Sequence, residues 1–149
     1  MTNRLEDTIL TNLIFNEEYT RKVLPFLKDE YFGTRSDKLL FTSIYDFITK
    51  YNNLPTKETL IIELNNRKDI NEEEFKAIKT TINGLTPQES DIQWLFDTTE
   101  KFCKDKAVNN AVLNGIKILD GKDQKRTPEA IPSILSEALA VSFDNHIGH

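Results

Sequence analysis

The stretch from Thr86 to Phe143 constrains the fold more than any other part of the chain. Thr86–Glu89 reads Thr-Pro-Gln-Glu, with a capping hydroxyl, a proline suited to the first helical position and a glutamate that can bond back to the cap. No proline or glycine then follows until Gly115. Apolar or small residues recur mostly at three- and four-residue spacing, at Ile92, Leu95, Phe102, Val108, Ala111, Val112, Gly115, Ile116 and Leu119. This pattern predicts one helix of about 30 residues.

Such a helix is too long for the rest of the chain to enclose. At about 1.5 Å per residue it spans roughly 45–50 Å. A compact chain of this size has a diameter of only about 40 Å. We therefore expect the C-terminal half of the helix to protrude. The alternative is a kink near Lys104–Lys106, which lets both halves pack within the chain.

A charged turn at residues 120–127 leads into a short return helix. Gly121 breaks the helical pattern, and Thr127-Pro128 and Ile131-Pro132 are two alternative helix starts. The return helix carries its apolar and small residues on one stripe, at Ile131, Ile134, Leu135, Ala138, Leu139 and Ser142. Because this helix covers only part of the long one, the remaining apolar surface is expected to meet a second copy or another protein. The predicted subunit-interface residues are Val108, Ala111, Val112, Ile134, Leu135, Ala138 and Leu139.

Residues 1–85 predict five shorter helices in a compact head. Their expected starts are Asn3 with Glu6, Asn16, Ser36 or Asp37, Thr56, and Asn71 with Glu74. The apolar residues of the head, such as Phe41, Ile44, Phe47 and Phe75, are spaced to satisfy one another in an internal core. No pair of strands with a hairpin turn is apparent. The predicted fold class is therefore all-α, a compact five-helix head (1–85) followed by a protruding antiparallel helical hairpin (86–143).

The sequence offers no arrangement of residues for catalysis or for holding a cofactor or metal. The nearest approach to a nucleotide-binding loop, Gly115 to Asp123, follows a helix instead of a strand and has Asp where a Ser or Thr belongs. His146 and His149 lie in a polar tail without a nearby cysteine, so no metal site is expected there. Cys103 is the only cysteine, which excludes an internal disulfide and is typical of a reducing compartment. We predict no catalytic, cofactor-binding or metal-binding residue.

The charge distribution limits the possible partners. A formal net charge of −5 argues against unspecific binding to duplex nucleic acid. The hairpin is locally basic, however, and its turn carries Lys122, Lys125 and Arg126, which we take as candidate partner-docking residues with a solvated face as the alternative. No apolar run approaches the ~18 residues of a membrane span, and the N-terminus lacks a signal-peptide core. A soluble, cytoplasmic protein is expected.

Several short patterns, in this order, resemble the N-terminal domain of DnaB-type replicative helicases. They are residues 9–19 (Ile-Leu to Asn-Glu-Glu-Tyr), 29–32 (Asp-Glu-Tyr-Phe), 38–55 (Lys-Leu-Leu-Phe to Leu-Pro) and 91–107 (Asp-Ile-Gln-Trp-Leu to Lys-Ala). The closing residues 138–149 are most similar to the T-even phage branch of the family. The resemblance covers almost the whole chain, and its specificity comes from the order and spacing of the patterns.

The resemblance implies the collar of a hexameric helicase in the host-cell cytoplasm, in which hairpins pair between neighbouring subunits and the collar docks primase. It also implies that residues 144–149 begin a linker to a motor domain, so that this chain is itself no enzyme and meets single-stranded DNA only through the full-length ring. The strongly charged turn is a departure that leaves the partner at its tip open. The alternative is a stand-alone phage adaptor or loader that binds nucleic acid through the basic hairpin.

Overall fold

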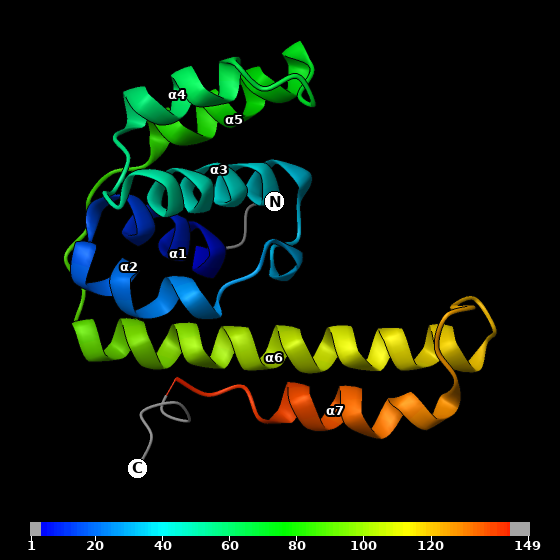
Figure 1. Ribbon diagram of the computed structural model, residues 1–149. Helices are drawn as coiled ribbons and strands as arrows, with labels where there is room; N and C mark the ends of the chain where they lie inside the picture. The colour runs from blue at the N-terminus through cyan, green and yellow to red at the C-terminus, as the bar shows by residue number, and fades with distance from the viewer. Residues whose placement is uncertain (1–3, 144–149) are drawn as a thin grey trace. The chain divides into compact units, whose positions relative to one another are not determined.

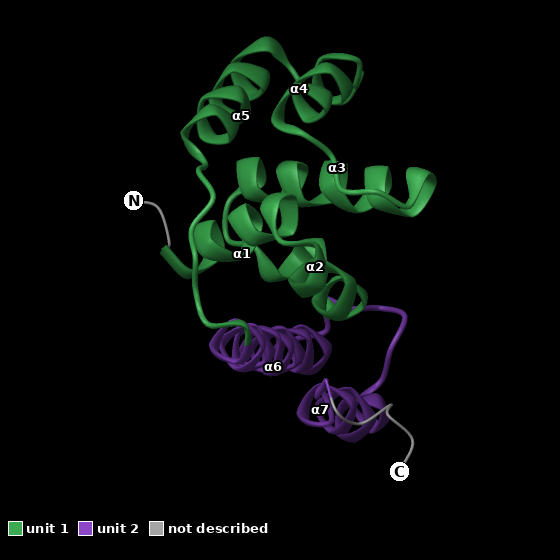
Figure 2. Ribbon diagram, turned by 90° about the vertical axis from the view of Figure 1, so that its left-hand side faces the viewer, with its two compact units in different colours: residues 1–92 green, residues 93–149 purple. Residues whose placement is uncertain are grey.

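A computed structural model describes residues 4–143 of the chain. Every regular element in that range is helical, which confirms the predicted all-α class. The chain divides into two compact units, residues 1–92 (unit 1) and 93–149 (unit 2) (Figure 2). The predictions that concern Asn3, His146, His149 and a linker at 144–149 lie outside the described residues.

Unit 1 is organised around helix α3 (Arg35–Tyr51), which lies between two helix pairs (Figure 1). Helix α1 (Arg4–Phe15), paired with α2 (Glu17–Val23), contacts α3 on one side. Helices α4 (Lys57–Asn65) and α5 (Glu72–Gly84) pair with each other and contact its other side. Two short 3-10 turns, η1 (Leu24–Phe26) and η2 (Asp29–Tyr31), connect α2 to α3. The fully buried side chains that join these layers include Leu10, Leu13, Tyr19, Phe32, Leu40, Ile44, Leu60, Leu64, Ile78 and Ile82.

Three of the predicted helix starts in unit 1 are confirmed by their capping hydrogen bonds. The side chain of Asn16 accepts from the backbone N–H of Tyr19, and that of Thr56 accepts from Thr59. Asn71 and Glu74 form the predicted capping box in both directions. Because these caps satisfy backbone donors that have no partner within the helix, they set where each helix begins.

One other prediction for unit 1 is wrong in detail. Helix α3 starts one or two residues before the predicted Ser36 or Asp37, because Thr34 is the cap and its hydroxyl accepts from the N–H of Asp37 at 3.2 Å. The carboxylate of Glu6 accepts a hydrogen bond from the backbone N–H of Gly33 at 2.7 Å. The predicted capping box of Glu6 with Asn3 lies outside the described residues.

The predicted internal core of the head is only partly right. Phe41 and Ile44 are buried, and the Phe41 ring stacks on Phe32 with centroids 5.1 Å apart. Phe47 and Phe75 are only half-buried, and each lines a surface groove. The helical period places these residues on the inward side of α3 and α5, but it does not show how far the neighbouring helices extend over them.

Unit 2 contains the long helix α6 (Ile92–Leu119) and the short helix α7 (Ile131–Leu139). The predicted start of α6 at Thr86 is wrong, since residues 86–91 are not helical. Ser90 and Asp91, both residue types that favour the N-cap position, come directly before Ile92 and supply a later start signal. The 28 residues of α6 continue through Lys104–Lys106 without a break, so the alternative of a kink there is excluded.

A 3-10 turn, η3 (Pro128–Ala130), precedes α7. The chain therefore uses both proline signals that the sequence offered, the first for the turn and the second for the helix itself. Among the described residues, no helix is both long enough and apolar enough to cross a membrane.

Three acidic side chains of unit 1 interact electrostatically where α1 and α3 pack. Glu6 and Asp37 are buried, and one carboxylate oxygen of Asp7 is buried without accepting a hydrogen bond from the described residues. Burial, followed by the negative charges of Glu6 and Asp7, raises the pKa of Asp37, while the Thr34 hydroxyl and Lys38 oppose the shift. Burial and the charge of Glu6 likewise raise the pKa of Asp7. A carboxyl group whose pKa rises on folding stabilises the fold below its unfolded pKa, and this stability is lost as the pH rises through the folded value.

We therefore expect Asp37→Asn to stabilise the chain at pH 7, because the amide keeps a polar partner for Thr34 without a buried negative charge. The free energy of unfolding of the variant relative to the wild type should rise as the pH rises from about 4, the ordinary aspartate pKa, towards neutrality, because only the wild type must ionise a buried Asp37. Urea denaturation at a series of pH values measures both. Asp46→Asn, an exposed position on the same helix, is the control and should leave the profile unchanged. A difference between variant and wild type that stays constant from pH 4 to pH 7 would contradict the expectation.

Candidate functional site

Helix α6 ends in a backbone motif that turns the chain back. Gly121 has a φ of 75°, in the left-handed region that glycine adopts without strain. The N–H of Gly121 donates to the carbonyl of Ile118 at 3.1 Å, and the N–H of Lys122 donates to the carbonyl of Lys117 at 2.9 Å. These two bonds are those of a Schellman motif, which satisfies carbonyls that a helix end leaves open. The reversal is thus specified by a glycine in a fixed position.

Helix α7 runs antiparallel beside α6, as Figures 1 and 2 both show. A methyl group built on Gly115 of α6 would lie 3.6 Å from a methyl carbon of Ile131, at the start of α7. Gly115 therefore lies beside the side chain of Ile131 near the turn, with room for one methyl group in ordinary van der Waals contact. The predicted antiparallel hairpin is therefore compatible with the structure of unit 2.

The chain that leaves α7 is attached to α6 by one carboxylate. Oε2 of Glu100 accepts from the backbone N–H of Phe143 at 2.6 Å and from the Ser142 hydroxyl at 3.1 Å. Phe143 is itself buried. Hydrogen bonds to a charged acceptor are the stronger kind, so this contact holds the C-terminal end of the hairpin against α6.

The largest group of exposed apolar side chains in the described part of unit 2 lies at the C-terminal end of α6, apart from Trp94 near its start. Four apolar side chains there are between 46% and 68% exposed, namely Val112, Leu113, Ile116 and Leu119. Val112, Ile116 and Leu119 are four and three residues apart and so lie on one side of the helix. We call these four residues the α6 apolar face. On α7, Leu139 is 62% exposed. Side chains of this size are usually covered in a soluble monomer when they lie together, so this face is the candidate functional site.

The predicted interface residues fall into three groups in the structure. Ala111 and Ala138 are buried, Val108, Ile134 and Leu135 are half-buried, and only Val112 and Leu139 are exposed. Leu113, Ile116 and Leu119 are exposed but were absent from the predicted set. The sequence did show Ile116 and Leu119 as apolar positions of the long helix, but the period alone does not tell which flank of that helix α7 covers.

The basic turn is held by an aspartate. Oδ1 of Asp123 accepts from the backbone N–H of Lys125 at 2.9 Å, and its other oxygen pairs with Nε of Arg126 at 2.8 Å. The hydrogen bond from the Lys125 backbone, followed by the bond from the Arg126 side chain, lowers the pKa of Asp123. Lys122 and Lys125 are exposed, and among the described residues their side chains form no ion pair. Of the three predicted docking residues, Arg126 is thus partly neutralised by its neighbour, and the two lysines carry the free charge.

Burial limits the chemistry of Cys103. Burial, together with the negative charge of Glu100, raises the pKa of the Cys103 thiol to about 12. A thiol with such a pKa is protonated at neutral pH and is a poor nucleophile. Within residues 4–143, no group of three or more histidine, cysteine, aspartate or glutamate side chains is placed to hold a metal ion.

In the described residues, every regular element is helical, and α6 together with α7 leaves an apolar face uncovered. No protein-family model matches the chain. The chain is similar to the DnaB-like replicative helicase of Enterobacteria phage T4, with 34% identity over 96% of this chain. This similarity confirms the resemblance that the sequence patterns indicated. The match spans 32% of the T4 protein, so the chain corresponds to about a third of that relative's length.

Two glycine substitutions in the hairpin should have opposite effects on stability. Gly115→Ala should raise the free energy of unfolding by about 0.5–1 kcal/mol, because alanine is the better helix former and its methyl group finds only ordinary van der Waals contact. Gly121→Ala should lower it by about 1 kcal/mol, because an alanine at positive φ is strained. Thermal and urea denaturation followed by circular dichroism measure both. Two changes of the same sign would show that the turn and the helix contact are assigned wrongly.

Proposed function

We propose that the chain is the N-terminal collar domain of a phage replicative DNA helicase, acting in the cytoplasm of the host cell. In this proposal, hairpins of neighbouring subunits pair within a hexameric ring, and the collar provides a docking surface for primase. The ATP-dependent motor belongs to the rest of the helicase, and this chain contributes assembly and docking. The observation that carries the proposal is the α6 apolar face, supported by the similarity to the T4 helicase over nearly the whole chain.

The free energy gained by burying the α6 apolar face is enough for weak pairing of two hairpins, and a closed ring would strengthen that pairing. Each of its four side chains is about half exposed, so covering one contributes about 1 kcal/mol, or roughly 8 kcal/mol when two identical faces meet. Association of two proteins costs about 4–15 kcal/mol in lost freedom. Two isolated hairpins should therefore pair weakly, and several contacts within a closed ring should make the assembly stable.

Replacing a residue of the α6 apolar face by aspartate should weaken self-association. Ile116→Asp places an unpaired charge in the proposed interface, and Leu139→Asp does so on α7. We expect both to yield a smaller species in sedimentation equilibrium with unchanged helicity. Ile62→Asp is the matched control, since Ile62 is 53% exposed but lies on α4 in unit 1. A wild-type chain that stays monomeric at high concentration would end the proposal of pairing through the hairpin.

The basic turn should accelerate docking of the cognate primase. Reversing Lys122, Lys125 and Arg126 to glutamate should slow association by about tenfold or more at low salt and only slightly at high salt, since exposed charges act mainly on the encounter rate. Stopped-flow or surface-based kinetics with purified primase measure this. A variant with Lys28, Lys68 and Lys104 reversed has the same net charge and should associate normally. An unchanged rate for the turn variant would remove the turn from the docking surface.

The second candidate function is a stand-alone adaptor or loader that binds nucleic acid through the exposed lysines of the turn. Binding to phosphates weakens steeply as salt rises, whereas apolar pairing does not. Single-stranded DNA binding by the purified chain that falls steeply between 50 and 200 mM salt, roughly as expected for several phosphate contacts, would favour this candidate. The formal net charge of −5 argues against this candidate, because a negatively charged chain repels the phosphates of nucleic acid.

A further inference from the structure

A groove on unit 1 is left unexplained by assembly through the hairpin. It lies between the end of α4 and the first turns of α5 and has a volume of about 340 Å³. Leu64, Ile70 and Phe75 supply its apolar lining, and Lys76 and Lys79 lie at its α5 side. Leu64 is buried, whereas Ile70 and Phe75 are half-buried and so present part of their apolar surface to the groove.

The walls of this groove are held in place by hydrogen bonds. Nη1 of Arg67, in the link between α4 and α5, donates to the hydroxyls of Thr42 and Ser43 at 3.1 Å each. Arg67 also pairs with Asp69 at 2.6 Å. The capping box of Asn71 and Glu74 fixes the start of α5 on the other side. A groove held in this way loses little conformational freedom when it binds a partner, which favours affinity.

The charge of the groove is positive and only weakly compensated. Glu72 is its one acidic lining residue, and it pairs with Lys76 at 3.6 Å where both side chains are largely exposed. Such a pair contributes little and is easily exchanged for a new partner. Lys79 forms no hydrogen bond or ion pair with the part of the chain that the structure describes. Two ammonium groups therefore flank the apolar lining of the groove. Lys79 is without an ion-pair partner among the described residues, and Lys76 can exchange Glu72 for a carboxylate of a ligand.

A second groove of unit 1 shows why the charge matters. It lies between α3 and α4, has a volume of about 300 Å³, and contains the paired rings of Phe47 and Tyr51. Its charged residues are balanced, with Lys50 and Arg67 against Asp46 and Glu63. The groove between α3 and α4 therefore favours neither a positively nor a negatively charged partner, whereas the α4–α5 groove favours a negatively charged one.

We propose that the α4–α5 groove is a docking site for an acidic peptide segment of a partner protein. An apolar side chain of the segment enters between Ile70 and Phe75, and flanking carboxylates pair with Lys79 and Lys76. The apolar anchor supplies most of the affinity, and the two lysines set the preference for acidic sequences. This site is on unit 1 and is separate from the α6 apolar face, so it does not depend on pairing through the hairpin.

The test uses the full chain and three labelled model peptides of about ten residues. The first carries one phenylalanine between aspartates and glutamates, the second replaces the acids by glutamine and asparagine, and the third replaces the phenylalanine by alanine. Fluorescence anisotropy should show saturable binding of the first peptide and at least about tenfold weaker binding of the other two. Lys79→Glu should weaken binding of the first peptide by about tenfold, and binding should weaken as salt is raised.

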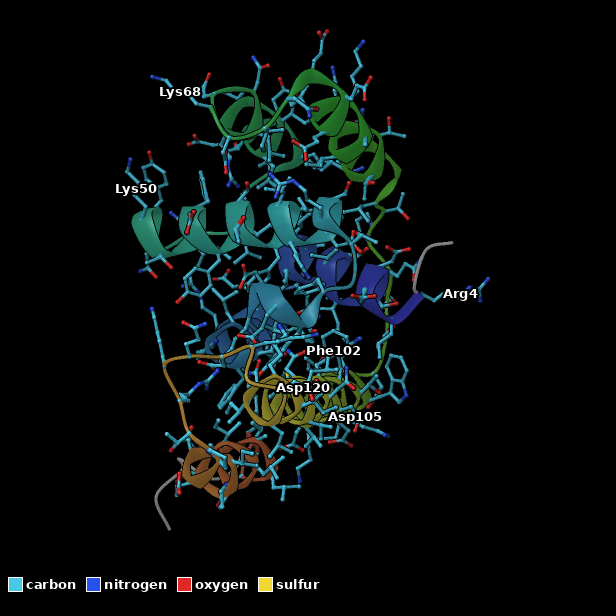
Figure 3. All side chains as sticks on the ribbon, turned by 90° about the vertical axis from the view of Figure 1, so that its right-hand side faces the viewer. Arg4, Lys50, Lys68, Phe102, Asp105 and Asp120 are labelled. Atoms are coloured by element: carbon cyan, nitrogen blue, oxygen red, sulfur yellow. The ribbon has the colours of Figure 1, made fainter. Side chains whose placement is uncertain are left out.

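Lys68→Glu is the matched control, because Lys68 lies in the same link but does not line the groove and its side chain points outward (Figure 3). It should bind the first peptide as the wild type does. Amide chemical shifts in a two-dimensional NMR spectrum should change around Ile70 and Phe75. The proposal is overturned if no peptide binds, if the neutral peptide binds equally well, or if the shifts fall on α6 and α7. It is also overturned if Lys79→Glu changes the sedimentation of the chain alone, which would mean that a second copy fills the groove.

Discussion

Helix α7 packs on one side of α6 only, and the surface of the second unit depends on this constraint. The exposed residues lie in the same stretch of α6 as Gly115, beside Ile131 of α7, so their exposure results from the side that α7 covers and not from its shorter length. Burial of Ala111, Gly115 and Ile118 leaves Val112, Leu113, Ile116 and Leu119 half exposed on the same helix. A long helix with apolar residues around much of its circumference has surface that its own hairpin leaves uncovered. This is the physical reason for the proposal that the chain acts through association.

The fold was largely predictable where the signals are local. Asn16, Thr56 and the pair of Asn71 and Glu74 begin helices as expected, because a cap is decided by residues within one turn of each other. The start of α6 was less predictable, because Thr86-Pro87 and Ser90-Asp91 both carry start signals and only the second pair directly precedes the helix. A single sequence does not show which of two neighbouring signals is used.

The candidate surface was predictable in kind but not residue by residue. The excess of apolar positions in the long helix indicated an uncovered face, yet Ala111 and Ala138 of the predicted set are buried, while Leu113 and Ile116 are exposed. The flank of α6 that α7 covers depends on how the chain leaves the Schellman motif at Gly121, which is a property of three-dimensional geometry. In the head, the same limitation hid the half-exposed Phe47 and Phe75, since a helical period defines a direction but not the depth of burial.

In the turn between α6 and α7, the residues that fix the backbone conformation differ from those that expose charged side chains. Its conformation rests on Gly121 and on the hydrogen bonds that Asp123 accepts, while the side chains of Lys122 and Lys125 take no part in closing it. The tip is therefore a position where recognition residues can be exchanged, or a short foreign epitope grafted, while the helices beneath keep their register. A turn of this kind lets the exposed side chains vary while the backbone conformation stays the same.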